Sequence, residues 1–429
     1  MKKKYRIILY TSIFLLCVVA SIILVVKKSN SVYEEESKPK VVKHKSMLSM
    51  NLEQTAGAGD YKTVTQSKWP TEGYKFNAEL SRCENGSTLS WDDTKKAVIV
   101  SGNLSDKCYV YFDIYQPTLA EYIKSQYTGT QGENNIYYHD SDLANGAGDN
   151  SYRYAGANPN NFVCFGSDTS PCPTDNLYRI IGVFGENYHG VTGKQLVKLI
   201  KYDYMTTDEL GTDGDYSQTY KEWGMDSTYK GTYGDGERIG VYYWNYKATG
   251  SATNTWSTSL LNKTNLNTNF INNIGTTWAN KIATVTWKVG GNTFANISDV
   301  VPATTYQNEI VNPVTTNTTD NATTYSAKIG LMYVSDYGFA ASPDAWTLTM
   351  SSYNNTTATN NNWMYMGLYE WTISRLADHS NNAFCVYCVG LVFSYDVDYY
   401  YGVRASFNLE SSVSYVSGSG SMSDPIVIN

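Results

Sequence analysis

The sequence predicts an α+β protein with one N-terminal transmembrane helix, then a small disulfide-tied β-hairpin module and a larger domain. Three observations predict this arrangement. The chain opens on an uncharged apolar run, an even number of cysteines follows that run, and short β-rich runs alternate with a few helical patterns. With 429 residues, the chain is long enough to bury at least one large core.

The first 28 residues predict a cytoplasmic tip and a membrane anchor. Residues 7–26 carry no charge, and a run of this length matches the thickness of a bilayer's hydrocarbon core. Lys or Arg flanks the run on both sides, and no clear small-x-small cleavage site accompanies it. We therefore expect an uncleaved single-pass anchor in the cell membrane. A removed export signal is the alternative.

Cysteine usage and charge predict that the bulk of the chain is extracellular. Six of the seven cysteines lie outside the apolar run, and an even count suits disulfides in an oxidising compartment. The first 28 residues hold six of the 33 Lys and Arg, which leaves 27 against 40 Asp and Glu, a net charge of −13. Such an acidic region disfavours nucleic acid and anionic lipid as partners.

Two segments precede the larger domain. Residues 29–70 are polar and lack a convincing apolar period, so we expect a stalk, with a short helix near residues 47–55 as an alternative. Residues 71–115 predict the hairpin module, because β-rich runs at 88–91 and 97–100 flank a polar turn and a third run covers 108–112. Cys83 and Cys108 bracket the hairpin, so we expect a disulfide that ties its open ends together.

Residues 116–429 predict one larger domain. Thr118 and Glu121 have capping-box spacing at the start of a short helix. Cys164 and Cys172 lie at the two shoulders of a Gly/Asp/Ser/Pro turn, which predicts a local disulfide. The clearest helix covers residues 256–274, and residues 304–324 read as a surface loop. In that helix Leu260 lies on the expected apolar face, and Leu261 lies off it. Strands are expected at 177–184, 195–201, 329–334, 363–365, 369–374, 383–389, 392–395 and 401–409.

Several stretches of this domain resemble one known group. The segments NLYRIIGVF (176–184) and AKIGLMYVSDYGF (327–339), and above all WTISR (371–375) and GVR (402–404), resemble uncharacterised surface proteins of Firmicutes. Those proteins carry a C-type-lectin-like module, in a class that includes formylglycine-generating enzymes and the variable proteins diversified by retroelements. The resemblance covers about residues 176–413. Ala405 departs from the pattern, because Pro is usual after the Gly-x-Arg.

The resemblance implies a C-type-lectin-like fold for residues 116–429. It also implies structural roles for Trp371, Arg375 and Arg404, in which the guanidinium groups stack on Trp or Tyr or bridge loops to the sheet. Formylglycine-generating enzymes use a reactive cysteine pair that binds copper, and the cysteines of this chain do not match that pattern. No Ser/His/Asp order and no His-Glu-x-x-His motif occurs. We therefore expect no catalytic residues, no cofactor and no metal.

The pair Cys385-x-x-Cys388 has several interpretations. In a strand the two Cα atoms would lie about 10 Å apart, beyond the reach of a disulfide, unless the strand breaks. The surrounding β-branched and aromatic residues favour strand or turn residues over a redox site at a helix start. Pairing elsewhere remains an alternative, and a metal site is disfavoured because the four histidines are dispersed.

The aromatic content indicates a binding function. The chain holds 38 Tyr and 10 Trp, and Asn, Ser, Thr and Gly fill most of its loops. Adaptable binding surfaces favour these residues, because rigid rings give contact area at a low cost in entropy. In relatives diversified by retroelements, the variable residues precede the final Gly-x-Arg strand. We expect a ligand-binding patch formed by Trp363, Tyr387, Tyr395, Tyr399 and Tyr400. The alternative for each tyrosine is a half-buried packing residue whose hydroxyl is hydrogen-bonded within the fold.

These observations predict a membrane-anchored extracellular binding or adhesion protein. Its ligand would be an unknown protein or glycan outside the cell. Two alternatives stay open. The first is an extracytoplasmic enzyme related to the formylglycine-generating group, and the second is a structural component of a surface layer or appendage.

Overall fold

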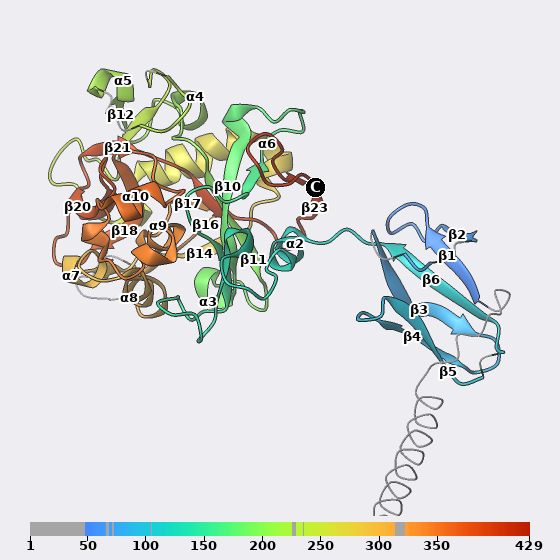
Figure 1. Ribbon diagram of the computed structural model, residues 1–429. Helices are drawn as coiled ribbons and strands as arrows, with labels where there is room; N and C mark the ends of the chain where they lie inside the picture. The colour runs from blue at the N-terminus through green and yellow to red at the C-terminus, as the bar shows by residue number, and fades with distance from the viewer. Residues whose placement is uncertain are drawn as a thin grey trace, which may run out of the picture. The chain divides into compact units, whose positions relative to one another are not determined.

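The computed structural model describes residues 48–65, 68–70, 73–103, 105–224, 229–234, 236–313 and 322–429. The chain divides into two compact units, Met1–Tyr115 and Gln116–Asn429 (Figure 1). The expected anchor at residues 1–28 and the first part of the expected stalk lie outside the described residues. Within the described part of the chain, no helix combines the length and the apolar character that crossing a membrane requires.

The N-terminal unit contains a four-stranded sheet of order β2-β1-β6-β3. Its strands are β1 (Leu48–Glu53), β2 (Tyr61–Val64), β3 (Tyr74–Cys83) and β6 (Cys108–Ile114). The stalk and the short helix expected before residue 70 are therefore wrong for residues 48–53 and 61–64, which are strands. Met50 and Leu52 are both buried, but an apolar alternation of only two residues is too short to identify a strand from the sequence. The strand β1 pairs in parallel with β6, which is distant in the sequence, so local patterns could not predict it.

The hairpin forms as expected. The strands β4 (Thr88–Asp92) and β5 (Ala97–Ser101) pair antiparallel as a separate two-stranded sheet. Trp91, on β4, contacts Phe112 of β6 edge to face. The expected disulfide between Cys83 and Cys108 is confirmed, and it joins directly opposed residues of β3 and β6. This small unit thus relies on a covalent bond as well as on its limited core.

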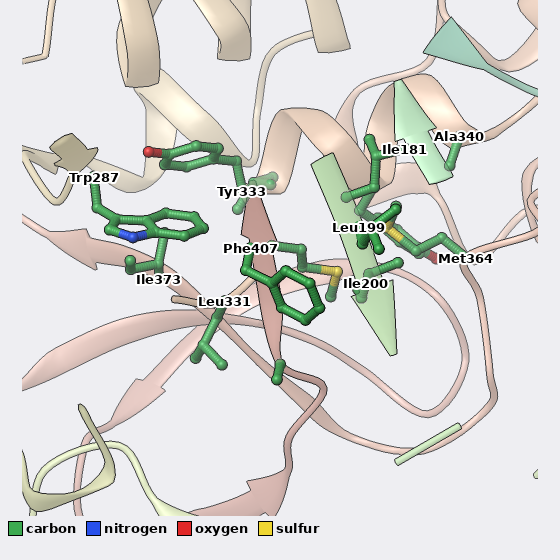
Figure 2. Close-up of a cluster of buried hydrophobic side chains, with 14 of the residues drawn as sticks. Ile181, Leu199, Ile200, Trp287, Leu331, Tyr333, Ala340, Met364, Ile373 and Phe407 are labelled. Carbon is green, nitrogen blue, oxygen red and sulfur yellow. The ribbon is translucent and has the colours of Figure 1, made fainter. Parts of the chain in front are cut away.

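In the C-terminal unit, the final part of the chain supplies a central strand to the first sheet. That sheet has the order β17-β22-β11-β10-β8-β7, and β9 also pairs with β10. Figure 2 shows Phe407 of β22 among buried side chains that include Leu199 of β11 and Leu331. The strands are β7 (Ile136–His139), β8 (Ser151–Tyr154), β9 (Phe162–Cys164), β10 (Leu177–Phe184), β11 (Leu196–Lys201), β17 (Ile329–Gly330) and β22 (Ser406–Asn408).

A second sheet of the same unit has the order β12-β13-β21-β18-β19-β20, with β15 paired in parallel to β18. Its strands are β12 (Tyr216–Thr219), β13 (Gly240–Tyr243), β15 (Gly291–Asn292), β18 (Glu370–Leu376), β19 (Asn382–Val386), β20 (Val392–Asp396) and β21 (Tyr400–Gly402). The expected single strand over residues 401–409 is instead divided between the two sheets. Val403, Arg404 and Ala405 form the link from β21 to β22.

Short elements complete the C-terminal unit. The expected disulfide between Cys164 and Cys172 is present, and Thr118 caps α2 with Glu121 in the expected capping box. Two small antiparallel sheets pair β14 (Val285–Lys288) with β16 (Thr324–Ala327) and β23 (Tyr415–Ser417) with β24 (Val427–Ile428). The α-helices are α2 (Leu119–Ser125), α3 (Glu186–His189), α4 (Thr207–Leu210), α5 (Tyr220–Trp223), α6 (Ile271–Ala279), α7 (Phe294–Ile297), α8 (Pro302–Tyr306), α9 (Val334–Ala340) and α10 (Thr356–Asn360).

The helix expected over residues 256–274 has a different winding. It begins as a 3₁₀ turn (Trp256–Thr258), continues as a π-helix (Leu261–Phe270) and ends in α6. In a π-helix residues five apart share a face, so Leu261 and Leu266 both point into the core. Leu260, expected on the apolar face, is 42% exposed. This segment also carries two buried asparagines with hydrogen-bonded side chains. Asn262 donates to the Trp256 carbonyl, and Asn265 donates to the Leu210 carbonyl.

Leu260 and Leu261 provide a test of which residues of this helical segment face the core. Leu261→Ala should lower the free energy of unfolding by about 2–5 kcal/mol, because it leaves a cavity at a fully buried position. Leu260→Ala, its matched control, should change that free energy by less than about 0.5 kcal/mol. Urea unfolding of the full chain measures both variants. A larger cost for Leu260→Ala would mean that the α-helical phase holds and that the π-helical one is incorrect.

Candidate functional site

A buried ion pair fixes the point where the chain crosses between the two sheets. Arg404 donates from Nε and Nη2 to the Glu370 carboxylate at 2.8 and 2.9 Å, and from Nη2 to the Met364 carbonyl at 2.6 Å. Arg404 and Glu370 are 1% and 2% exposed. Burial acts to lower the pKa of Arg404, but the carboxylate of Glu370 outweighs it and the pKa is raised. The guanidinium therefore keeps its charge inside the core.

The other two residues assigned structural roles are also buried. Trp371 is fully buried and donates its indole N–H to the Tyr242 carbonyl at 2.9 Å, which links β18 to β13. Arg375 is 1% exposed, and its Nε donates to the Val289 carbonyl at 2.8 Å. Trp371 and the two arginines thus all contact backbone carbonyls of segments distant in sequence. The second sheet is braced from within by side chains of β18 and of the link after β21.

Above this braced layer lies a continuous set of aromatic side chains, which we call the aromatic surface. Each of its members is half-buried or exposed, and each ring contacts at least one other ring of the set. It contains four of the five residues predicted to bind a ligand. Its members are Trp223, Tyr243, Tyr246, Tyr369, Tyr387, Phe393, Tyr395, Tyr399 and Tyr400.

The rings of the aromatic surface form a chain of contacts in which each ring touches the next. Ring centroids lie 4.8 Å apart from Tyr399 to Tyr395 and 5.7 Å apart from Tyr395 to Tyr387. Tyr387 lies 4.8 Å from Tyr369, and Tyr369 lies 5.6 Å from Trp223. These separations are those of favourable offset or edge-to-face pairs, so each ring restricts its neighbours.

The remaining contacts extend the set through Trp223 to β13 and to the other face of the sheet, because Tyr400 and Tyr243 are opposed residues that point away from the face of Tyr401. Trp223 lies 5.6 Å from Tyr400, and Tyr400 lies 5.6 Å from Tyr243. Tyr243 stacks on Tyr246 at 4.6 Å. Tyr401, which is 2% exposed, lies beneath and contacts Tyr369 at 5.0 Å. The exposed ring of Tyr399 also contacts Tyr401, at 6.4 Å.

Exposure is highest at three members of the aromatic surface. Tyr399 is 47% exposed, Tyr246 46% and Phe393 42%, although large apolar side chains usually find burial. A patch of exposed rings in mutual contact is typical of a surface that binds another molecule. The tyrosine hydroxyls add hydrogen-bonding groups at the outer ends of the rings. This arrangement suits noncovalent recognition.

Trp363 does not belong to the aromatic surface, which corrects its assignment as a ligand-binding residue. It is 4% exposed and donates its indole N–H to the Tyr154 carbonyl at 2.8 Å. Its ring lies 4.6 Å from the guanidinium of Arg179, which also stacks on Phe162. Residues 363–365 form a turn instead of the expected strand. The pairing with Arg179, distant in sequence, explains why Trp363 is buried.

Sequence reasoning missed several members of the aromatic surface. Phe393 alternates with Tyr395 along β20, and this period-2 signal could have placed Phe393 on the same face as Tyr395. Trp223, Tyr243 and Tyr246 had no such signal, because they come from α5, β13 and the segment after β13. Only the pairing of β13 with β21 brings Tyr243 opposite Tyr400.

Cys385 and Cys388 carry thiols in this structure. Cys385 lies on β19 and is fully buried, in a cross-strand row between Trp371 of β18 and Phe393 of β20. Burial raises the pKa of the Cys385 thiol well above its ordinary value. Cys388 lies in the turn after β19 and is half-buried. Burial, followed by a hydrogen bond with Cys388, raises the pKa of Tyr369 to about 12.

Among the residues that the structure describes, no three His, Cys, Asp or Glu side chains are grouped so that they could hold a metal ion. Comparison of the chain with protein-family models, characterised proteins and solved structures gave no match. The candidate site therefore rests on the geometry of this chain alone.

The two thiols should differ in reactivity. At pH 8, iodoacetamide should alkylate Cys388 in the folded protein and leave Cys385 unmodified, because Cys385 is buried and its raised pKa leaves little thiolate. Mass spectrometry of the digested protein measures both. Alkylation in urea should label the two sites equally. Equal labelling in the folded protein would contradict the burial of Cys385.

The ion pair should be strongly coupled. Arg404→Leu should lower the free energy of unfolding by about 3–5 kcal/mol, because it leaves the carboxylate of Glu370 buried without its counter-charge. The double variant Arg404→Leu with Glu370→Leu should be less destabilised than the sum of the two single variants. Urea unfolding of the four proteins measures this coupling. Additive costs would show that the pair does not act as a unit.

Proposed function

We propose that this chain is a membrane-anchored extracellular binding or adhesion protein, and that the aromatic surface is where its ligand docks. One observation carries the proposal. Nine aromatic side chains contact one another across the second sheet, and Tyr246, Phe393 and Tyr399 remain between 42% and 47% exposed. Burying such rings against a partner gains apolar contact, and the energetic centres of interfaces are enriched in Trp and Tyr.

Rigid support favours this role. Tyr395 and Tyr399 contact Tyr401, whose ring lies 4.6 Å from that of the fully buried Trp371. The rings therefore lose little conformational freedom when a ligand covers them, which favours affinity. The ligand class that suits such a surface is a protein or a glycan outside the cell, since both present apolar patches beside hydrogen-bonding groups.

Two further features support the proposed location. The disulfides Cys83–Cys108 and Cys164–Cys172 suit an oxidising environment, and the uncharged run at residues 7–26 suits an anchor. A C-type-lectin-like fold for residues 116–429 is part of the proposal and rests on the motifs WTISR and GVR. In that fold, the loop before the final Gly-x-Arg strand is the part exposed to ligands.

A catalytic role is less well supported. Of the two thiols, Cys385 is fully buried with a raised pKa, so it exists almost entirely as the protonated and unreactive form. An enzyme of the formylglycine-generating type needs a reactive cysteine pair. Cys385 lies opposite Trp371 and Phe393 in the second sheet, which supports a packing role for its side chain.

The double variant Tyr399→Ala with Tyr400→Ala tests the proposed function. Wild-type protein should bind one or more members of a glycan array or an array of extracellular proteins. The double variant should lose at least about tenfold in affinity for that ligand, because two rings of one contact surface are removed. Met422→Ala is the matched control, since Met422 is 44% exposed but is not a member of the aromatic surface.

Circular dichroism and thermal unfolding should be alike for the variant and the wild type, so that a loss of binding reports the surface itself. Unchanged affinity of the double variant for every ligand of the wild type would remove the aromatic surface from the proposal. Absence of any ligand in both arrays for well-folded protein would count against a binding function.

A further inference from the structure

A pocket of about 670 Å³ opens in the C-terminal unit among residues that do not belong to the aromatic surface. Its lining comes from four places in the sequence, which are the turn before β8, α3, β14 and the helical segment 302–311. Pockets of this size hold small molecules in other proteins. The composition of its wall then decides which class of molecule fits.

The floor of the pocket is rigid and its charge is already balanced. Asp149 accepts from Arg153 Nη2 at 2.7 Å and from the backbone N–H of Ser151. Arg153 is 1% exposed and stacks on the rings of Phe184 and Tyr306 at 4.7 and 5.0 Å. Asp149 therefore shapes the pocket, and its hydrogen-bonding capacity is largely used within the protein.

The rim carries polar groups that are available to a ligand. Asn187 and Gln307 are exposed, and no hydrogen bond of their side chains to another described residue is present in the structure. Lys288 is half-buried at the same pocket. Glu186 accepts the Gly193 N–H through Oε2, which leaves Oε1 for another donor. A side-chain amide both donates and accepts, and so do the hydroxyls of a polyol.

One wall is apolar. Ile310 and Val311, on the last turn of the segment 302–311, line the pocket together with the ring of Tyr306. A pyranose ring combines the same two kinds of group. Its hydroxyls point outward around the ring, and the two faces of the ring carry apolar C–H groups. Apolar side chains beside amides, a carboxylate and an ammonium group match that distribution.

We propose that this pocket binds one hexose-sized unit of a saccharide, with Asn187 and Gln307 hydrogen-bonded to neighbouring hydroxyls and Val311 against the ring. Other ligand classes fit less well. Asp149 is already paired with Arg153, so Glu186 and Lys288 leave no excess of positive charge in the lining to hold a phosphate or another multivalent anion. A purely apolar ligand would cover the polar rim without replacing its hydrogen bonds to water. This inference does not depend on the aromatic surface.

Saturation-transfer NMR tests the proposal on the full chain, kept in a zwitterionic detergent that has no sugar headgroup. The probes are the methyl glycosides of glucose, galactose and N-acetylglucosamine. At least one should show saturable transfer to the wild type. Asn187→Ala and Gln307→Ala should each weaken its binding about tenfold, because each removes hydrogen bonds to the ligand.

Two variants make the test specific. Val311→Trp should abolish binding by filling the pocket while every polar group stays in place. Asn272→Ala, an exposed amide on α6 outside the pocket, should bind as the wild type does. The Tyr399→Ala with Tyr400→Ala variant should keep its binding of the monosaccharide, so the pocket and the aromatic surface are tested separately.

Three results would overturn the proposal. They are the absence of saturable transfer from all three glycosides to folded wild-type protein, unchanged affinity in both amide variants, or loss of monosaccharide binding only in the tyrosine double variant.

Discussion

The ion pair between Arg404 and Glu370 is the interaction on which the C-terminal unit depends. Arg404 lies in the three-residue link between β21 and β22, and these two strands belong to different sheets. The parallel pairing of β18 with β21 involves only Glu370 and Gly402. The backbone pairing between β18 and β21 is therefore short, and the ion pair between Arg404 and Glu370 adds a second connection between these strands. This connection sets the position of β21.

The first sheet uses a similar device. Lys198 of β11 and Asp336 of α9 are completely buried, 2.7 Å apart, and the hydroxyl of Tyr188 bonds to both. Burying charges is unfavourable unless each finds partners, so such groups fix one arrangement of the elements that carry them. Both candidate sites rest on this kind of support. Tyr400, a member of the aromatic surface, lies on the strand that leads into the Arg404 link, and Asp149, the partner of Arg153, lines the pocket.

Local signals in the sequence predicted much of the fold. The capping box at Thr118, the strand at residues 177–184 and the disulfide Cys164–Cys172 depend on neighbours close along the chain. The disulfide Cys83–Cys108 spans 25 residues but could be predicted, because the hairpin between the two cysteines brings them together. Features that depend on distant partners were not predicted. The strand β1 needs β6, the burial of Trp363 needs Arg179, and the phase of the π-helix rests on the contacts of residues such as Asn265. For the aromatic surface, the tyrosines before the Gly-x-Arg strand were predicted, whereas Trp223 and Tyr243 required the sheet order. The pocket was missed because residues 304–311, read as a loop, are helical.

The bond between Cys83 and Cys108 has a mechanical consequence for a chain pulled from both ends. Tension entering along β3 passes through the sulfur atoms directly into β6, so the 24 residues between the two cysteines carry no load. The hairpin β4–β5 can then neither be stretched out nor lengthen the molecule while the bond is intact. Reducing agents would release that slack, and the chain would gain extensibility at this point.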